Sequence, residues 1–248
     1  MSNRVAIVLA AGKGTRMMSE LPKVLVPVLG RPMLDYVLDA LADCGVVRTL
    51  VVVGYRKELV EQTIAQRPNT TPVTQSPQLG TGHAVMMCRE QLAGFDGPVL
   101  IVTGDSPLIQ RDSVTQLLAE FDRTRPACLL GTAHKDDPVG LGRIVRDAAG
   151  NFAAIVEEKD ATDDQRRITE VNMSCYIFNC RDLCYALDHL RADNRQKEYY
   201  LTDCPGILKA AGRDVRALPV LKPIETLSIN TFDELAAVEQ ALRELEAG

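Results

Sequence analysis

Runs of consecutive apolar residues in the first half of the chain predict buried strands. They cover residues 5–11, 50–53 and 98–103, and a run at 127–130 has the same character. A strand that is apolar along its whole length is typical of a parallel sheet, because helices cover both faces of such a sheet. These runs therefore favour an α/β fold built on a parallel sheet.

Segments with helical periodicity lie between these runs. Pro32 suits the first position of a helix that Gly45 would end, with apolar residues at i, i+3, i+4 and i+7 between them. Thr81 is expected to cap a helix that runs to Leu92, and Asp112 to cap a further amphipathic helix. The alternation of strands and helices supports the α/β assignment.

The pattern changes from about residue 138 onward. Two short apolar runs, at 152–156 and 174–178, predict strands, and the charged stretch 157–170 between them has the composition of a surface loop or short helix. No linker rich in Gly, Ser or Pro divides the chain. We therefore expect one domain over residues 1–248, with one half at about 1–137, a smaller α+β half at about 138–227 on the same sheet, and a closing helix at 231–247.

Composition narrows the possible functions. The 248 residues include 28 Lys and Arg against 33 Asp and Glu, a formal net charge of −5, so no global positive field favours a nucleic-acid partner. No stretch reaches the roughly 18 apolar residues of a membrane span. Seven cysteines without a Cys-x-x-Cys pair favour reduced packing cysteines and a cytoplasmic location, and three well-separated histidines do not suggest a zinc site.

A glycine-rich loop follows the first predicted strand. It contains Gly12 and Gly14, yet it lacks the third glycine of the dinucleotide fingerprint and the Gly-Lys-Ser/Thr ending of a P-loop. Its backbone can approach phosphates closely, and Lys13, Arg16 and Lys23 surround it with positive charge. Taken alone, the loop is either an anion-binding site or an ordinary turn.

Eight segments in order resemble the sugar-1-phosphate nucleotidyltransferase family. Within that family they are most similar to the uridylyltransferase domain of the bifunctional enzyme that makes UDP-N-acetylglucosamine, and the similarity extends from about residue 5 to 230. The segments are LAAGKGTRM (9–17), PKV (22–24), QLGTGHA (78–84), GDSPL (104–108), GLGRI (140–144), VEEKDAT (156–162), EVN (170–172) and EYYLTD (198–203).

This resemblance implies both a fold and a reaction. The fold would be α/β, a Rossmann-like mixed and mostly parallel central sheet flanked by helices, with a smaller acceptor-binding subregion in the second half. The reaction would be Mg²⁺-dependent transfer of a uridylyl group from UTP to N-acetylglucosamine 1-phosphate, giving UDP-N-acetylglucosamine and pyrophosphate. We expect small-molecule substrates as the partners, and a monomer or weak dimer.

The resemblance also assigns catalytic and metal-binding roles. Attack of a sugar phosphate on the α-phosphorus of UTP requires alignment of two anions and neutralisation of the leaving pyrophosphate, a task suited to Arg16 and Lys23. Asp105 and Asn230 are expected to hold Mg²⁺, which prefers oxygen ligands. The structural alternatives are surface cations, a turn Asp and an Asn beside a helix.

Binding roles are carried over in the same way. Amide groups and closely approaching backbone would recognise the nucleotide, and polar side chains would recognise the amino sugar. The implied nucleotide-binding residues are Leu9, Ala10, Ala11, Gly12, Lys13, Gly14, Thr15, Gln75, Gln78, Gly80 and Thr81, and the implied sugar-binding residues are Thr103, Gly142, Glu157, Asn172, Tyr200 and Thr202.

The chain departs from the family pattern in three places. Ser174 stands where the family has glycine near the sugar, and Pro77 stands where Glu is common. The sequence holds no hexapeptide repeat, so we expect no acetyltransferase β-helix domain. Two alternatives stay open: the same chemistry with glucose 1-phosphate and UTP or dTTP, and a nucleotide-sugar sensor without catalysis.

Overall fold

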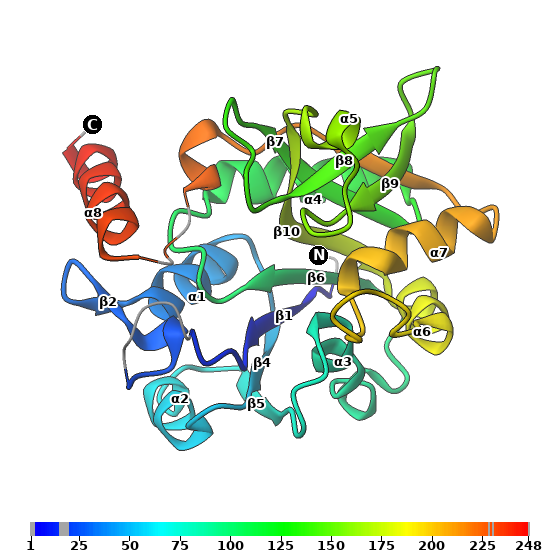
Figure 1. The fold of residues 1–248 in the computed structure, drawn as a ribbon. Coiled ribbons are helices and arrows are strands. Elements are labelled where there is room, and N and C mark those ends of the chain that lie inside the picture. Colours follow the sequence, from blue (N-terminus) through cyan, green and yellow to red (C-terminus); the bar gives the residue numbers. More distant parts are fainter. Residues whose placement is uncertain (1–2, 15–19, 228, 230, 248) are drawn as a thin grey trace.

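A mixed sheet forms the centre of the molecule (Figure 1). The computed structural model describes residues 3–14, 20–227, 229 and 231–247, and within them the sheet has nine strands. Its main path has the spatial order β11 (Val215–Leu218), β7 (Cys128–His134), β10 (Glu170–Asn179), β6 (Pro98–Thr103), β1 (Val5–Ala10), β4 (Arg48–Val53) and β5 (Thr70–Thr74).

The sheet is parallel over the nucleotide-binding half expected from the sequence. Strands β6, β1, β4 and β5 pair in parallel, whereas β10 is antiparallel to both β6 and β7. Two further strands, β8 (Gly142–Arg146) and β9 (Phe152–Val156), form an antiparallel pair that joins the sheet through β10. The predicted mixed, mostly parallel α/β fold is confirmed.

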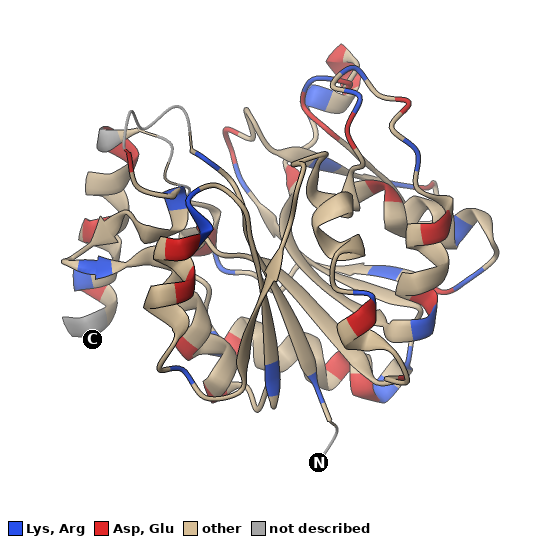
Figure 2. Cartoon of the chain, turned by 90° about the horizontal axis from the view of Figure 1, so that it is seen from below, with Lys and Arg blue, Asp and Glu red and all other residues tan. Residues whose placement is uncertain are grey.

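Helices cover both faces of the sheet. Alternate residues of β1 belong to two hydrophobic clusters, with Val5 and Ile7 in one and Ala6 and Val8 in the other. Figure 2 shows that Lys, Arg, Asp and Glu lie mainly on the outer helices and loops. Helices α3 (Thr81–Met86), α6 (Cys180–His189) and α7 (Cys204–Ala210) pack on the first cluster, and α1 (Met33–Asp43), α2 (Lys57–Ile64) and α4 (Arg111–Thr124) on the second.

A third cluster lies beside the main sheet. The hairpin of β2 (Pro27–Val28) and β3 (Arg31–Pro32) packs against α8 (Phe232–Ala247), with Val28, Val238 and Leu242 among its buried residues. The backbone amide of Leu29 donates to Glu239 Oε1 at 3.0 Å. The closing helix therefore packs on this hairpin (Figure 1).

Several helix boundaries differ from the prediction. Pro32 belongs to β3 and precedes α1, α3 ends at Met86 instead of Leu92, and α4 begins one residue before Asp112. A capping box opens α8, since Glu234 N donates to Thr231 Oγ1 at 3.2 Å and Thr231 N donates to Glu234 Oε2 at 2.9 Å. The charged stretch 157–170 contains one short helix, α5 (Asp163–Arg166).

The helices and cysteines agree with a globular α/β domain. None of the described helices combines the length and the apolar character needed to cross a membrane. All seven cysteines are free thiols, and six of them are buried in the core.

Candidate active site

A cleft of about 360 Å³ opens at the carboxyl ends of β1 and β6. Ligands of open α/β sheets bind at this edge, where loops follow the strand ends. The structure brings ten of the sequence-predicted site residues to this cleft, namely Leu9, Ala11, Gly12, Lys23, Gln75, Gln78, Gly80, Thr81, Thr103 and Asp105.

The glycine-rich loop turns back toward Lys23. Gly14 has φ +66°, and a Cβ atom there would lie 2.6 Å from Lys23 Cβ, so only glycine fits without displacing the lysine. Ala10 ends β1 and is buried, while Lys13 places its ammonium 5.3 Å from the ring centre of Tyr55. The predicted residues Thr15 and Arg16 lie outside the described residues.

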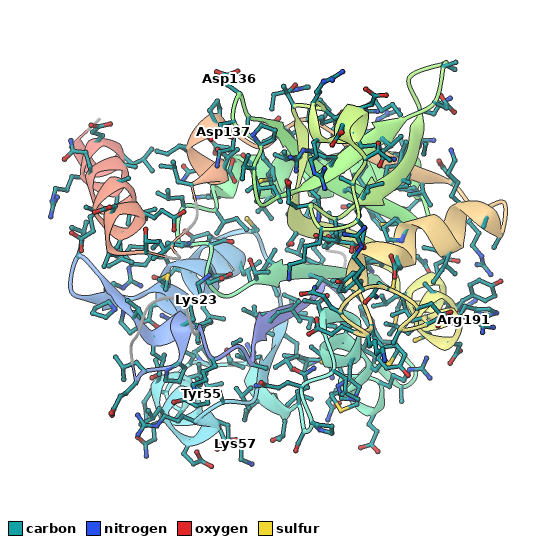
Figure 3. The ribbon with its side chains drawn as sticks, in the orientation of Figure 1. Lys23, Tyr55, Lys57, Asp136, Asp137 and Arg191 are labelled. Carbon is teal, nitrogen blue, oxygen red and sulfur yellow. The ribbon has the colours of Figure 1, made fainter. Side chains whose placement is uncertain are left out.

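Lys23 and Asp105 form an ion pair in the cleft. Lys23 Nζ lies 2.6 Å from Asp105 Oδ2, and their side chains are 17% and 29% exposed. Lys23 opens a short 3-10 helix, Lys23–Leu25, between the β2–β3 hairpin and the end of β1 (Figure 3). Gly104, just before Asp105, donates its amide to Leu9 O at 2.9 Å, which holds the loop after β6 against β1.

The described residues fit a metal ion held mainly by substrate. Asp105 offers a carboxylate in the cleft, and the predicted second ligand, Asn230, lies outside the described residues. Among the residues that the structure describes, no group of three or more His, Cys, Asp or Glu side chains could hold a metal by itself. Mg²⁺ often takes one or two carboxylates and completes its octahedron with phosphate oxygens and water, so this donor set suits Mg²⁺ bound with a nucleotide.

Two glutamine side chains shape the inner part of the cleft. Gln75 is only 5% exposed, and its Nε2 donates to Gly80 O at 3.0 Å and lies 3.2 Å from His83 Nδ1. Gln78 Nε2 donates to Ala11 O. The amide groups are thus fixed in orientation by the backbone around the cleft, as recognition of a base edge requires.

The segment with Gly80 and Thr81 is bonded to the segment that follows α6. Tyr199 N donates to Leu79 O at 2.9 Å, and Gly82 N donates to Tyr199 O at 2.7 Å. Gly80 has φ +107°, and a Cβ there would lie 2.6 Å from Tyr199 O. Close approach of two backbones therefore explains this glycine.

Four of the six predicted sugar-binding residues lie close to one another. Thr202 Oγ1 donates to Glu157 Oε1 at 2.9 Å, and Asn172 pairs with Gly142 across β10 and β8. A Cβ on Gly142 would lie 3.5 Å from Asn172 Cβ and 3.7 Å from Glu157 Oε1. Burial raises the pKa of the Glu157 carboxyl, and the hydrogen bond from Thr202 opposes this shift.

Tyr200 and Thr103 lie at the edges of this group. Tyr200 and Glu157 line a neighbouring cavity of about 480 Å³, together with Asp203. Thr103 lines the cleft at the carboxyl ends of β1 and β6 and also a small cavity of about 20 Å³ that it shares with Ser174. Of the six predicted sugar-binding residues, Thr103 is thus the one among the described lining residues of the cleft, whereas Glu157 and Tyr200 line the second cavity.

Ser174 adopts a backbone conformation that favours glycine. Its φ is +52°, at the irregularity of β10 between Asn172 and Cys175. Its amide donates to Asn172 Oδ1 at 3.3 Å. The departure from the family pattern thus falls at a bulge that bends the strand next to the predicted sugar-binding asparagine.

Two acidic residues of the site were missed in the sequence. Glu198 lines the cleft at the carboxyl ends of β1 and β6, and Asp203 lines the cavity beside Glu157. Burial raises the pKa of Asp203 to about 6, with further contributions from Glu157 and Asp160. Both residues belong to the segment EYYLTD, which was the available signal, but only the fold shows which of its side chains face a cavity.

Comparison with known proteins agrees with this geometry. Residues 6–201 match the MobA-like NTP transferase domain family. The chain belongs to this family. It is 45% identical over 239 residues to the bifunctional protein GlmU of Pelotomaculum thermopropionicum, covering 96% of this chain and 52% of the relative. The GlmU protein of Geotalea daltonii is 41% identical over 243 residues, 98% of this chain and 53% of the relative. The chain thus spans about half the length of these relatives.

Solved structures share the fold at low sequence identity. A UDP-glucose pyrophosphorylase complexed with UDP-glucose aligns with a TM-score of 0.79 at 16% identity, covering 98% of this chain and 99% of that one. A putative glucose-1-phosphate thymidylyltransferase from Bacillus anthracis, in complex with a sucrose, aligns with a TM-score of 0.81 at 16% identity, covering 97% and 95%. The resemblance found in the sequence is therefore confirmed at the level of family and fold.

Proposed function

We propose that this chain catalyses Mg²⁺-dependent transfer of a uridylyl group from UTP to N-acetylglucosamine 1-phosphate, releasing pyrophosphate. The observation that carries the proposal is the Lys23–Asp105 ion pair in the same cleft as Gln75 and Gln78. A cation and a carboxylate suit the phosphates, and fixed amides suit a pyrimidine. Together they describe a site for a nucleoside triphosphate.

The nucleotide would lie along the carboxyl ends of the parallel strands. Gln75 and Gln78 would bond the uracil edge, and Gly80 would let the backbone approach the ribose. Gly12 and Gly14 would place backbone amides near the triphosphate. The side chains of Gln75 and Gln78 are already held by hydrogen bonds to Gly80 O and Ala11 O, so little ordering of these two side chains is needed when UTP binds.

The transfer step needs no covalent nucleophile from the protein. A phosphate oxygen of the sugar attacks the α-phosphorus, and the bond to the leaving pyrophosphate breaks in line with it. Lys23 would neutralise negative charge that grows on the pyrophosphate, with Arg16 as the second cation expected from the sequence. Mg²⁺, when bound through Asp105 and Asn230, supplies further positive charge to the phosphates.

The acceptor would occupy the group around Glu157. The carboxylate accepts a hydrogen bond from Thr202 and has capacity to accept others from sugar hydroxyls. Gly142 leaves space beside Asn172, whose amide side chain suits an acetamido group. A sugar phosphate bound by these polar side chains would extend its phosphate toward the α-phosphorus of a nucleotide in the cleft.

The relatives support the nucleotidyltransferase reaction more strongly than they support the identity of the sugar phosphate acceptor. The GlmU proteins are 41–45% identical to nearly the whole chain, which favours the UDP-N-acetylglucosamine branch. Ser174 is the observation behind the alternative acceptor, glucose 1-phosphate, since it replaces a glycine next to Asn172.

A matrix of substrates tests the proposal. UTP and dTTP would each be combined with N-acetylglucosamine 1-phosphate and glucose 1-phosphate, and pyrophosphate release measured with and without Mg²⁺. We expect UTP with N-acetylglucosamine 1-phosphate to give the highest kcat/KM, and only with Mg²⁺. Equal or faster turnover of glucose 1-phosphate would identify glucose 1-phosphate as the acceptor instead. Nucleotide binding without turnover of any substrate pair would favour a nucleotide-sugar sensor.

A further inference from the structure

Arg143 is a buried cation next to the predicted acceptor site. It lies on β8, directly after Gly142, and is only 1% exposed. Its guanidinium donates to Glu158 Oε2 at 2.7 Å, to Arg166 O at 3.4 Å and to Leu141 O. A buried arginine is tolerated only when its charge is paired and its donors are satisfied, so these contacts fix its position.

Glu158 extends this contact to other segments. Its Oε2 also accepts a hydrogen bond from Gly140 N at 3.2 Å, and its Oε1 lies 3.5 Å from Arg166 Nε. The hydrogen bond from Arg143 is the largest cause that lowers the pKa of the Glu158 carboxyl, which keeps it ionised. The pair therefore joins the turn before β8, the end of β9 and the end of α5.

Each member of the pair is adjacent to a predicted sugar-binding residue. Gly142 precedes Arg143, and Glu157 precedes Glu158. Glu157 contacts Thr202 while Glu158 contacts Arg143, so the two neighbouring carboxylates have different partners. A Cβ added at Gly142 would lie 3.7 Å from Glu157 Oε1. The two chain segments that set this spacing are joined by the pairing of β8 with β9, where Arg143 is opposite Val156, and beyond the end of β9 by the ion pair.

We propose that Arg143 and Glu158 are positioning residues that hold Gly142 and Glu157 at the spacing needed for the sugar phosphate. The proposal rests on the proposed function, because it assigns the acceptor to this group. Neither residue lines the nucleotide cleft. Loss of the pair should therefore weaken acceptor binding and leave UTP binding almost unchanged, since Gln75 and Gln78 belong to the other half of the sheet.

The test uses Glu158→Gln and Arg143→Lys in the full chain. Glu158→Gln keeps the size of the side chain and removes its charge, and Arg143→Lys keeps the charge but loses the guanidinium donors to the two carbonyls. We expect KM for the sugar phosphate to rise about tenfold in Glu158→Gln and less in Arg143→Lys, because small misplacements of binding groups have large effects. KM for UTP should stay within about twofold.

Arg167→Met is the matched control. Arg167 pairs with Asp164 at 3.0 Å, also at α5, but both side chains are largely exposed at 79% and 91%. Both KM values should be unchanged in this variant. A parallel rise of both KM values in Glu158→Gln, with a falling melting temperature, would mean a general structural role and would overturn the proposal.

Hydrogen exchange separates this proposal from the proposed function. In Glu158→Gln, amides in peptides covering 140–143 and 156–160 should exchange faster, while peptides covering 75–84 keep the wild-type rate. Unchanged exchange at 140–143 and 156–160 would refute the positioning role, whatever the enzyme turns over. Absence of turnover in the wild-type chain, with the local change in exchange present, would instead refute the proposed function.

Discussion

The backbone amide of Leu201 donates a hydrogen bond to Thr81 Oγ1 at 3.0 Å. Thr81 lines the proposed nucleotide cleft, and Leu201 lies between Tyr200 and Thr202 of the proposed acceptor group. The hydroxyl can accept this bond and still donate its own proton to a nucleotide. One side chain thus directly connects the two segments proposed to bind the substrates.

Replacing Thr81 by Val should weaken the binding of both substrates. The change keeps the shape but leaves the Leu201 amide without its acceptor, at a cost of about 1–3 kcal/mol. We expect higher KM values for UTP and for the sugar phosphate and a lower melting temperature. Thr81→Ser keeps the hydroxyl and serves as the control. Wild-type KM values in Thr81→Val would show that the bond connects nothing of functional importance.

Replacing Lys23 by Ala should reduce kcat more than it changes KM. The negative charge that Lys23 would face increases as pyrophosphate departs. Removal of Lys23 therefore destabilises the transition state more than the bound substrates. We expect kcat to fall about 10²-fold or more, as for loss of one preorganised donor. The measurement is the steady-state rate of pyrophosphate release.

Lys57→Ala is the matched control for this lysine. Lys57 opens α2, and its Nζ donates to Thr74 Oγ1 at 3.4 Å, outside the residues that line the cleft (Figure 3). Its kcat should match the wild type. If Lys23→Ala alters only KM for the sugar phosphate, Lys23 is a binding cation without a role in transfer.

Asp105→Asn should abolish activity without unfolding the protein. The substitution keeps one oxygen and the size of the side chain but removes the negative charge that would offset Mg²⁺. Asp105 lies beyond the end of β6 and is 29% exposed in its side chain, so little packing is lost. A Mg²⁺ titration of pyrophosphate release checks the rate, and thermal melts check the fold. Near wild-type activity at ordinary Mg²⁺ would remove Asp105 from the metal site.

Asp203 should make the protein less stable at neutral than at acidic pH. Its pKa is raised to about 6 in the folded chain, from 3.8, so between these values the folded state binds more protons than the unfolded state. The free energy of unfolding contributed by this group therefore falls as pH rises from about 4 to 6. Asp203→Asn removes this dependence.

Melting temperatures at pH 5 and pH 8 test the assignment. We expect the wild-type melting temperature to decrease more between the two values than that of Asp203→Asn, and the variant to be the more stable of the two at pH 8. Identical pH dependence in both proteins would place the titrating group elsewhere.

The buried strands were predictable because each of them is a run of consecutive apolar residues that can be recognised without knowledge of the rest of the chain. Residues 98–103 and 152–156 match β6 and β9 residue for residue. By contrast, β5 was missed, since it is an edge strand in which Pro72 and exposed threonines interrupt the pattern. Strand β8 was missed because it buries a charged residue, Arg143. The sequence pattern around the strand does not reveal that Glu158, in a later segment, compensates this charge.

The site could be predicted only in part. Lys23 and Asp105 are 82 residues apart, and no periodicity brings them together, so their association came from the family resemblance alone. The link between Thr81 and Leu201 spans 120 residues and had no signal in the sequence. Contacts of this kind depend on how β10 and the loops beyond it fold back onto the parallel strands.

The packing of α8 on the β2–β3 hairpin has a consequence for biosynthesis. The hairpin follows Lys23 directly, yet its apolar surface is covered by Val238 and Leu242, which are translated more than 200 residues later. A nascent chain on the ribosome can form the parallel strands early, but the hairpin that follows Lys23 stays without its packing partner until α8 has emerged. The Lys23 side of the cleft is therefore completed only after α8 has been synthesised.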